Sequence, residues 1–139
     1  MNFKHRTALQ IRFKDIDSLG HVNNANHLTY CEISRVKYFT DVIGENINWS
    51  KRGIILAKAV LDYKHPILLN DLIFVQTKCS RIGNKSFDLS YSIIKELNGQ
   101  QTEMMSALTT MVCFDYSSQK TIKIPDEWRK KMVEFEDNI

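Results

Sequence analysis

The alternation of apolar and polar residues near the start of the chain predicts a strand. From about Thr7 to Lys14 the side chains alternate with a period of two, as expected of a half-buried strand. Its apolar face carries Leu9, Ile11 and Phe13. Asp15 and Asp17 continue the phase of Phe13, so both carboxylates point toward the apolar side as long as the chain stays extended.

Between His21 or Val22 and about Ile43 the period changes to that of a helix. The apolar arc of this helix contains Leu28, Cys31, Val36, Phe39, Val42 and Ile43, and the residues expected outside it are Ser34, Lys37, Thr40 and Asp41. The same arc also contains His21, Asn24, Glu32 and Arg35. Polar groups on a buried face are unfavourable unless they are paired or used, so these four residues require an explanation.

The rest of the chain is typical of a strand meander. Four strands are expected, at Ile54–Lys64, Leu72–Arg81, Ser86–Lys95 and Thr102–Phe114, with hairpin signals at Gly83-Asn84 and Asn98-Gly99. The third of them alternates cleanly, with Phe87, Leu89, Tyr91 and Ile93 on one face and Asp88, Ser90 and Ser92 on the other. Pro125 opens a short C-terminal helix, DEWRKKMVEF.

This order of elements predicts an α+β fold in which one long helix covers the inner face of a five-stranded antiparallel sheet. The chain has 139 residues, 43% of them apolar and 25% charged, which is the size and composition of one domain over residues 1–139. Lys and Arg number 19 against 16 Asp and Glu, and the basic residues are scattered. A nucleic-acid partner is therefore not expected.

The three cysteines, Cys31, Cys79 and Cys113, are odd in number and match neither a metal-ligand spacing nor a redox pair. They are typical of buried thiols in a reducing compartment. The N-terminal residues lack the apolar stretch of a signal peptide, and no window approaches the roughly 20 apolar residues of a membrane span. We therefore expect a cytoplasmic protein without a membrane span.

Two carboxylates, a histidine and two amides are concentrated where the first strand gives way to the helix, at Asp15, Asp17, His21, Asn23 and Asn24. A helix N-terminus presents unpaired backbone N–H groups and a positive dipole end, which can stabilise negative charge on a carbonyl oxygen. A nearby carboxylate can act as general base or nucleophile, and an imidazole can orient it or carry protons. This combination suits hydrolysis by acyl transfer.

Spacing alone leaves other interpretations of the junction open. Asp, Ser, Gly and Asn are also what an ordinary turn and helix N-cap require. A metal site is the weakest alternative, because His21 and His27 with Asp15 and Asp17 lack the spacing of a zinc site. Glu32 and Arg35, three apart on one helical face, are more simply an ion pair than catalytic groups.

The segment Asp17–Asn24 (DSLGHVNN), followed by a helix with Leu28, Tyr30, Glu32 and Arg35, resembles the signature of hot-dog-fold acyl-CoA thioesterases of the hydroxybenzoyl-CoA thioesterase superfamily. Three later segments fall in the order expected for the long-chain acyl-CoA thioesterase III (FadM-like) branch, namely Leu61–Pro66, Gly83–Ser86 and Val112–Asp115. Together with the first segment they cover nearly the whole chain.

The resemblance implies a sheet wrapped around the central helix and a homodimer, or a tetramer, with active sites at the subunit interface. It also implies hydrolysis of a medium- to long-chain acyl-CoA to free acid and CoA, without metal or organic cofactor. By position, Asp17 matches the family's catalytic base or nucleophile, and the backbone N–H near Asn24 matches the donor to the thioester carbonyl. His21 matches a histidine suited to orienting water or the acyl group.

The resemblance also points to Arg81, Lys85 and Ser86, which flank the Gly83-Asn84 turn where the superfamily often contacts the CoA phosphates. Two cations and a hydroxyl suit a phosphate, although exposed cations at a turn are also ordinary. The chain departs from related acyl-carrier-protein thioesterases at Leu19, where they carry a second polar residue. Asp17 and His21 must then suffice, or another chain must help.

Two other functions remain compatible with the same fold. The first is a non-catalytic module that binds acyl-CoA or regulates through it. The second is an enoyl-CoA hydratase, because hot-dog hydratases also use an Asp and His pair. Retention of both Asp17 and His21 argues against the non-catalytic module.

Overall fold

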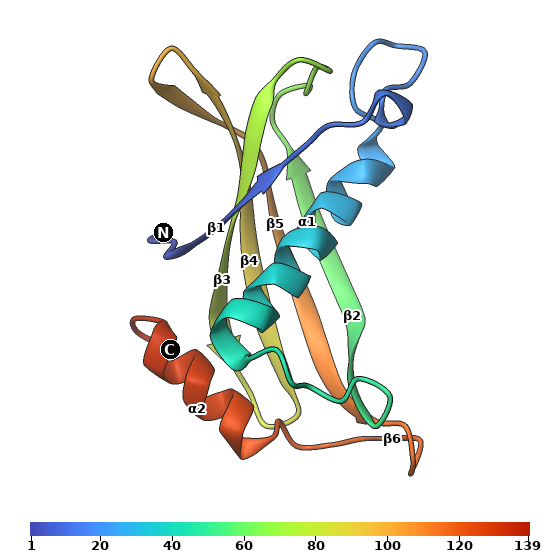
Figure 1. Ribbon diagram of the computed structural model, residues 1–139, viewed down its shortest axis with the longest axis vertical. Coiled ribbons are helices and arrows are strands. Elements are labelled where there is room, and N and C mark those ends of the chain that lie inside the picture. The colour runs from blue at the N-terminus through green and yellow to red at the C-terminus, as the bar shows by residue number, and fades with distance from the viewer.

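A long helix lies across the inner face of a curled antiparallel sheet in the computed structural model, which describes residues 1–139 (Figure 1). The strands pair in the order β1-β3-β4-β5-β2, and β6 pairs with β5. The elements are β1 (His5–Leu9), α1 (Asn24–Tyr38), β2 (Arg52–Tyr63), β3 (Leu72–Ile82), β4 (Ser86–Leu97), β5 (Gln100–Asp115), β6 (Lys120–Thr121) and α2 (Asp126–Phe135). The predicted α+β class is confirmed, with the two-residue β6 as an addition.

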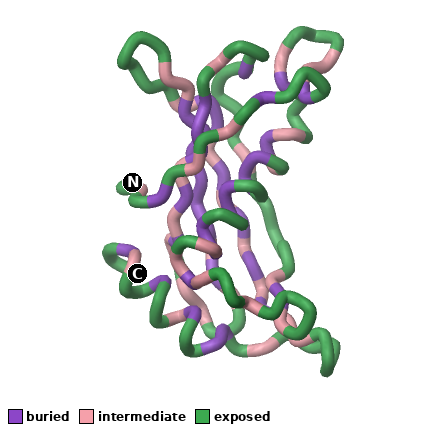
Figure 2. Tube along the Cα trace, in the orientation of Figure 1, coloured by how far each residue is buried: buried purple, intermediate pink, exposed green.

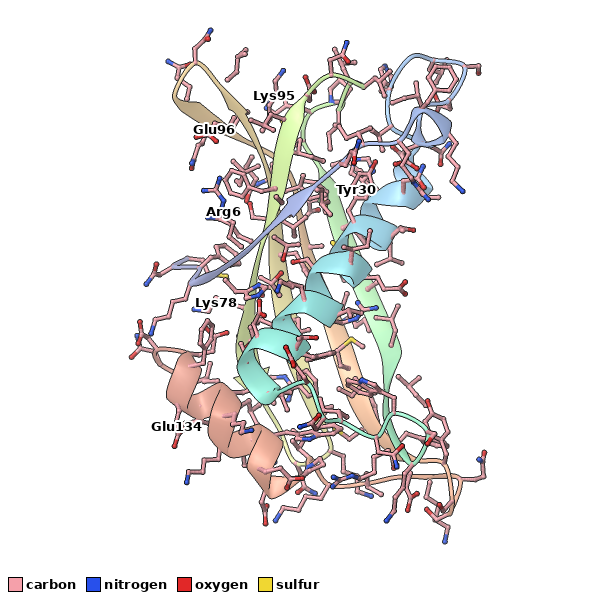
Figure 3. The ribbon with its side chains drawn as sticks, in the orientation of Figure 1. Arg6, Tyr30, Lys78, Lys95, Glu96 and Glu134 are labelled. Atoms are coloured by element: carbon pink, nitrogen blue, oxygen red, sulfur yellow. The ribbon has the colours of Figure 1, made fainter.

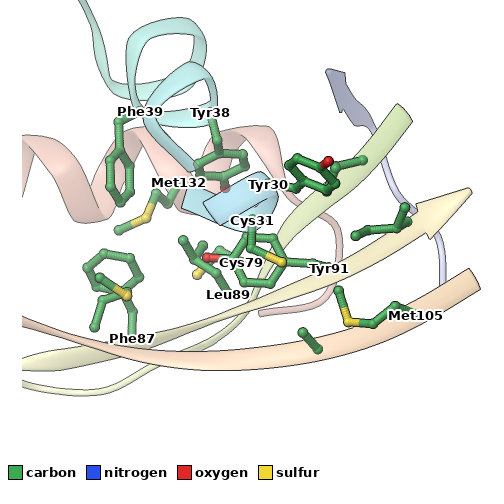
Figure 4. Close-up of a cluster of buried hydrophobic side chains, with 14 of the residues drawn as sticks. Tyr30, Cys31, Tyr38, Phe39, Cys79, Phe87, Leu89, Tyr91, Met105 and Met132 are labelled. Atoms are coloured by element: carbon green, nitrogen blue, oxygen red, sulfur yellow. The ribbon is translucent and has the colours of Figure 1, made fainter. Parts of the chain in front are cut away.

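The core lies between α1 and the inner faces of β4 and β5. The alternation predicted for β4 is confirmed, because Phe87, Leu89, Tyr91 and Ile93 are all buried and oppose inward residues of β5. Tyr30, Cys31, Tyr38 and Phe39 cover these side chains from the helix side (Figure 4). The three cysteines are free and fully buried, as expected, and burial raises the pKa of each thiol.

The predicted helix is shorter than expected, and its buried face was predicted only in part: Cys31, Arg35, Phe39 and Ile43 are buried as expected, but other residues are not. His21 precedes the helix, which begins at Asn24, and the chain beyond Tyr38 continues as one π-helical turn over Phe39–Ile43. The residues that α1 buries are His27, Tyr30, Cys31, Ser34, Arg35 and Tyr38. Ser34, expected outside, hydrogen-bonds Thr77 in the interior, whereas Val36, expected inside, is 59% exposed. The buried face carries polar groups with partners, so apolarity alone could not locate it.

The first strand also ends earlier than predicted. The strand ends at Leu9, the alternation of buried and exposed side chains continues only as far as Arg12, and a 3₁₀ turn occupies Phe13–Asp15. Phe13, expected on the apolar face, is 83% exposed, while Asp15 is buried. The physical reason is that the Asp15 carboxylate accepts hydrogen bonds from Arg12 and from Tyr30, which bends the chain around it.

Strand β2 is an edge of the sheet, and most of its residues are exposed (Figure 2). Its pairing with β5 shifts register between Leu56 and Lys58, so Ala57 is the extra residue of a β-bulge.

The C-terminal helix α2 has the predicted bounds and buries Trp128 and Met132. No helix is long and apolar enough to cross a membrane.

Candidate active site

Asp17 begins a tight turn that leads into α1. Its own N–H donates to the carbonyl oxygen of His21 at 3.0 Å, and the Gly20 N–H donates to the carbonyl oxygen of Asp17 at 3.0 Å. Gly20 has a φ of +88°, a conformation that glycine adopts without strain. This turn fixes the backbone on both sides of the Asp17 carboxylate.

The Asp17 carboxylate itself has two hydrogen-bond donors. Oδ1 accepts from the Leu19 N–H at 2.9 Å, and Oδ2 accepts from the Asn23 side-chain amide at 3.2 Å. The side chain is half-buried, so it keeps access to solvent. Leu19, whose side chain breaks the family pattern, therefore contributes through its backbone.

Asn23 is the N-cap of α1 and joins the carboxylate to the helix end. Its side-chain oxygen accepts from the Ala25 N–H at 2.9 Å, and its carbonyl oxygen accepts from the Asn26 N–H at 2.9 Å. The Asn24 N–H has no acceptor in the chain, as is common for first-turn amides. A free helix N-terminal donor thus lies next to the residue whose side chain holds Asp17.

Asp15, the second carboxylate of the junction, has a structural role. Its oxygens accept from the Arg12 side chain at 2.8 Å and from the Tyr30 hydroxyl at 2.8 Å, and Tyr30 projects from the first half of α1 (Figure 3). Burial raises the pKa of the Asp15 carboxyl, but hydrogen bonds from Arg12 and Tyr30 outweigh it and hold the pKa below its usual range. The Asp15 carboxylate is therefore buried and held by partners within the chain, whereas the Asp17 carboxylate keeps access to solvent.

A cavity of about 310 Å³ opens beside the start of α1 and is lined by both His21 and Asn24. His27 and Tyr63 also line it, with their rings edge to face at a centroid distance of 4.9 Å. The Tyr63 hydroxyl donates to the carbonyl oxygen of Asn24 at 3.0 Å. Asp17 does not line this cavity, but its carboxylate accepts a hydrogen bond from Asn23, the residue before Asn24.

His27 is buried, and its Nδ1 forms no hydrogen bond of normal geometry. Burial lowers the pKa of this imidazole, although the backbone carbonyls of Asn23 and Asn24 offset part of the effect. The ring is therefore neutral at neutral pH. No group of three or more His, Cys, Asp or Glu side chains is placed to hold a metal ion.

The residues predicted to bind the CoA phosphates lie far from Asp17 within one chain. Arg81 forms two hydrogen bonds to Asp88, at 2.7 and 3.1 Å, and one to Ser86 at 3.1 Å, while Lys85 is exposed. The turn that carries them ends β3, whose 11 residues span about 36 Å at 3.3 Å per residue. The start of α1 lies at the other end of β3 (Figure 1). There the Val22 N–H donates to the carbonyl oxygen of Ile67, which is in the segment that leads into β3.

A family model described as the thioesterase-like superfamily matches residues 11–132. The chain belongs to this superfamily. The matched residues include the Asp17 turn, α1 and every strand that follows α1.

Relatives of this thioesterase-like chain cover nearly its whole length. The long-chain acyl-CoA thioesterase FadM of Escherichia coli (strain K12) is 28% identical over 133 residues, which are 94% of this chain and 98% of FadM. A thioesterase from Thermus thermophilus, solved with coenzyme A and Zn, has a TM-score of 0.80 at 29% identity and covers 95% of this chain and 99% of its own.

A 1,4-dihydroxy-2-naphthoyl-CoA thioesterase from Synechocystis has the same fold, with a TM-score of 0.83 at 19% identity over 94% of this chain and 96% of its own. These likenesses confirm the hot-dog fold that the sequence resemblance implied.

Sequence reasoning on this thioesterase-like chain missed Tyr63 as a site residue and considered His27 only as a metal ligand. Tyr63 lies within the segment Leu61–Pro66, which resembled the family, but nothing in its spacing linked it to a helix much earlier in the chain. Their contact follows from β2 ending beside the start of α1. The available signal was a polar aromatic residue near the end of a predicted strand.

Proposed function

We propose that the protein hydrolyses the thioester of an acyl-CoA to free acid and CoA, with Asp17 as the catalytic carboxylate. The observation that supports this most directly is the connection of Asp17 through Asn23 to the N-terminus of α1, where the Asn24 N–H is free. Membership of the thioesterase-like superfamily and the full-length likeness to FadM point to the same reaction.

In this mechanism the Asn24 N–H binds the thioester carbonyl oxygen and stabilises the charge that develops there. One such donor contributes about 10²- to 10³-fold in kcat. Asp17 removes a proton from water, the resulting hydroxide attacks the carbonyl carbon, and the tetrahedral intermediate expels the CoA thiolate, which takes up the proton. Direct attack by Asp17 through an anhydride is the alternative, and water then hydrolyses the anhydride. His21, which lines the cavity, orients the water or the acyl group.

The active unit that we propose is a homodimer formed along β2, with a tetramer as a further assembly. This edge strand is 12 residues long and exposes Ile55, Val60 and Tyr63, and such an edge favours pairing with another chain. Antiparallel pairing of two β2 strands places the β3–β4 turn of one copy at the same end as the Asp17 turn of the other. In that arrangement Arg81, Lys85 and Ser86 of one chain serve the substrate of its neighbour.

Free cysteines in the core support a reducing, cytoplasmic setting for this reaction. Hydrolysis needs only water as co-reactant, so the proposal includes no organic cofactor and no metal.

The test is thiol release from a panel of acyl-CoAs that differ in chain length, with Asp17→Asn as the variant. Loss of a general base lowers kcat about 10²- to 10⁴-fold with little change in KM. Asp126→Asn, at an exposed carboxylate of α2, serves as the control and retains activity. Full turnover by Asp17→Asn would overturn the assignment.

The same panel separates the two other functions. A module that only binds acyl-CoA gives saturable binding without thiol release. A hydratase converts an enoyl-CoA to a hydroxyacyl-CoA and leaves the thioester intact.

A further inference from the structure

The carbonyl oxygens of the β3–β4 turn, residues 83–85, all accept hydrogen bonds from later parts of the chain. Those of Gly83 and Asn84 both accept from Nη2 of Arg129, at 2.7 and 3.2 Å. That of Lys85 accepts from a backbone N–H of β5 at 3.0 Å. Arg129 belongs to α2, whose start lies beside this turn (Figure 1). The carbonyl side of the turn therefore faces the rest of the molecule.

The N–H groups of the same peptides have no acceptor. Neither the Asn84 N–H nor the Lys85 N–H donates to any group of the chain. A trans peptide is planar, so its N–H points away from its C=O. Because Arg129 holds both carbonyl oxygens, the two N–H groups point to the opposite side, where Asn84 and Lys85 are exposed. Successive backbone N–H groups in a turn form a concavity that binds anions.

The charges around the turn favour an anion at this concavity. The Lys85 side chain is exposed and forms no ion pair, so its charge is free. Arg81 is different, because Asp88 accepts from its Nε and Nη2 and neutralises it. Arg129 pairs with no carboxylate and donates only to carbonyl oxygens, so its charge adds to that of Lys85.

Arg129 is held in place because α2 is anchored in the core. Trp128 and Met132 of this helix are buried, and so is Ile124 just before it. The Ile124 N–H donates to the Asn84 carbonyl oxygen at 2.9 Å, the same oxygen that accepts from Arg129. The orientation of the turn thus depends on a helix that contributes nothing to the Asp17 site.

We infer that the backbone N–H groups of Asn84 and Lys85 bind a phosphate of the CoA nucleotide, and that Arg129 is the positioning residue that orients them. This inference rests on the proposed thioesterase function. Hydrogen bonds to a charged phosphate are stronger than those between neutral groups. The turn lies far from Asp17, so a change at Arg129 should weaken nucleotide binding and leave the hydrolysis step unchanged.

The test compares two thioesters of one acyl group, the first with CoA and the second with pantetheine, which lacks the nucleotide and its phosphates. Arg129→Met should raise KM for the acyl-CoA about 10-fold, as for the loss of one hydrogen bond to a charged group, with kcat nearly unchanged. Its kcat/KM for the pantetheine thioester should equal that of the wild-type protein. Lys130→Met, at an exposed cation of the same helix, is the matched control and should change neither value.

A second measurement does not depend on hydrolysis. Adenosine 3′,5′-bisphosphate, a nucleotide without the thioester, is added to isotope-labelled wild-type protein, and the amide resonances of Asn84 and Lys85 are followed by NMR. Both should shift and saturate, whereas adenosine should leave them in place. In Arg129→Met the same shift should need about 10-fold more nucleotide. If that variant does not fold, Arg129→Gln, which is too short to reach both carbonyl oxygens, takes its place in both experiments.

Absence of a shift at both amides of the wild-type protein would overturn the backbone site. An equal loss of kcat/KM for the two thioesters in Arg129→Met, or no loss for either, would overturn the positioning role of Arg129. If neither thioester is hydrolysed by the wild-type protein, the proposed function fails, and the nucleotide titration still decides whether the turn binds a phosphate.

Discussion

The Tyr63 hydroxyl donates a hydrogen bond to the carbonyl oxygen of Asn24 at 3.0 Å. This bond joins the last residue of β2 to the first residue of α1. The carbonyl belongs to the same residue whose N–H is free, so Tyr63 fixes the peptide plane that directly follows the one carrying the proposed oxyanion donor.

Tyr63→Phe should therefore lower kcat while leaving KM nearly unchanged. The ring that contacts His27 stays in place, and only the hydroxyl is lost. One hydrogen bond contributes about 0.5 to 1.5 kcal/mol, which corresponds to a decrease of about 2- to 10-fold. Steady-state thiol release measures it, and Tyr116→Phe, at a tyrosine just beyond the end of β5, is the control. An unchanged kcat for Tyr63→Phe would show that the bond has no positioning role.

Asn23 has two separable roles, as helix cap and as donor to Asp17. Asn23→Ser keeps an N-cap oxygen but lacks the amide that reaches the carboxylate, so stability should change little and kcat should fall. Asn23→Ala loses both and should also lower the free energy of unfolding by about 1 kcal/mol. Urea unfolding and thiol release on the same preparations distinguish the two roles. Full activity of Asn23→Ser would contradict the role of Asn23 in holding Asp17.

The Asp15 carboxylate should make stability depend on acid pH. Burial raises its pKa, but the hydrogen bonds from Arg12 and Tyr30 to the charged form prevail, so the folded-state pKa lies below the ordinary 3.8. The stabilisation is complete above the unfolded pKa and is lost as pH falls through the folded pKa. Asp15→Asn should be less stable at pH 7 by about 1 to 3 kcal/mol, with the difference shrinking as the pH falls below 3.8. Urea unfolding at several pH values measures this, and a constant difference would contradict it.

The exposed edge of β2 should carry the dimer. Ile55→Asp places a charge on that edge and should yield a chain that sediments as a monomer and has lost most of its thioesterase activity. Val133→Asp, at an apolar residue of α2 with similar exposure, should leave both properties unchanged. Analytical ultracentrifugation and thiol release provide the two readouts. A fully active monomer of either protein would contradict the shared active site.

Elements with one buried apolar face could be predicted from the sequence. The alternation of β4 was confirmed because its inner face is apolar and its outer face is polar, and α2 was confirmed because Pro125 marks its start. On α1 the position of Ser34 was predicted wrongly, because a hydrogen bond to Thr77 holds it inside, whereas Arg35 is buried as predicted and hydrogen-bonds Tyr91. Those partners lie 43 and 56 residues later in the chain, beyond the reach of any local pattern.

The candidate site was predictable where its residues are neighbours in the chain. Asp17 and Asn24 lie together because one turn and one N-cap join them. The sequence could not distinguish Asp15 from Asp17 as a candidate carboxylate. In the structure the Asp15 carboxylate accepts hydrogen bonds from Arg12 and Tyr30. Tyr63 reaches the site only through the pairing of β2 with β5, which no spacing in the sequence discloses.

The bulge at Ala57 determines on which side of the sheet the end of β2 presents its side chains. Before the bulge the inward residues carry even numbers, Ile54 and Leu56, and after it they carry odd numbers, Ala59, Leu61 and Tyr63. If this strand ran without the bulge, every residue beyond Leu56 would exchange faces, and Tyr63 would point away from Asn24. One extra alanine in the middle of an edge strand thus determines that the tyrosine at the end of the strand faces the start of α1.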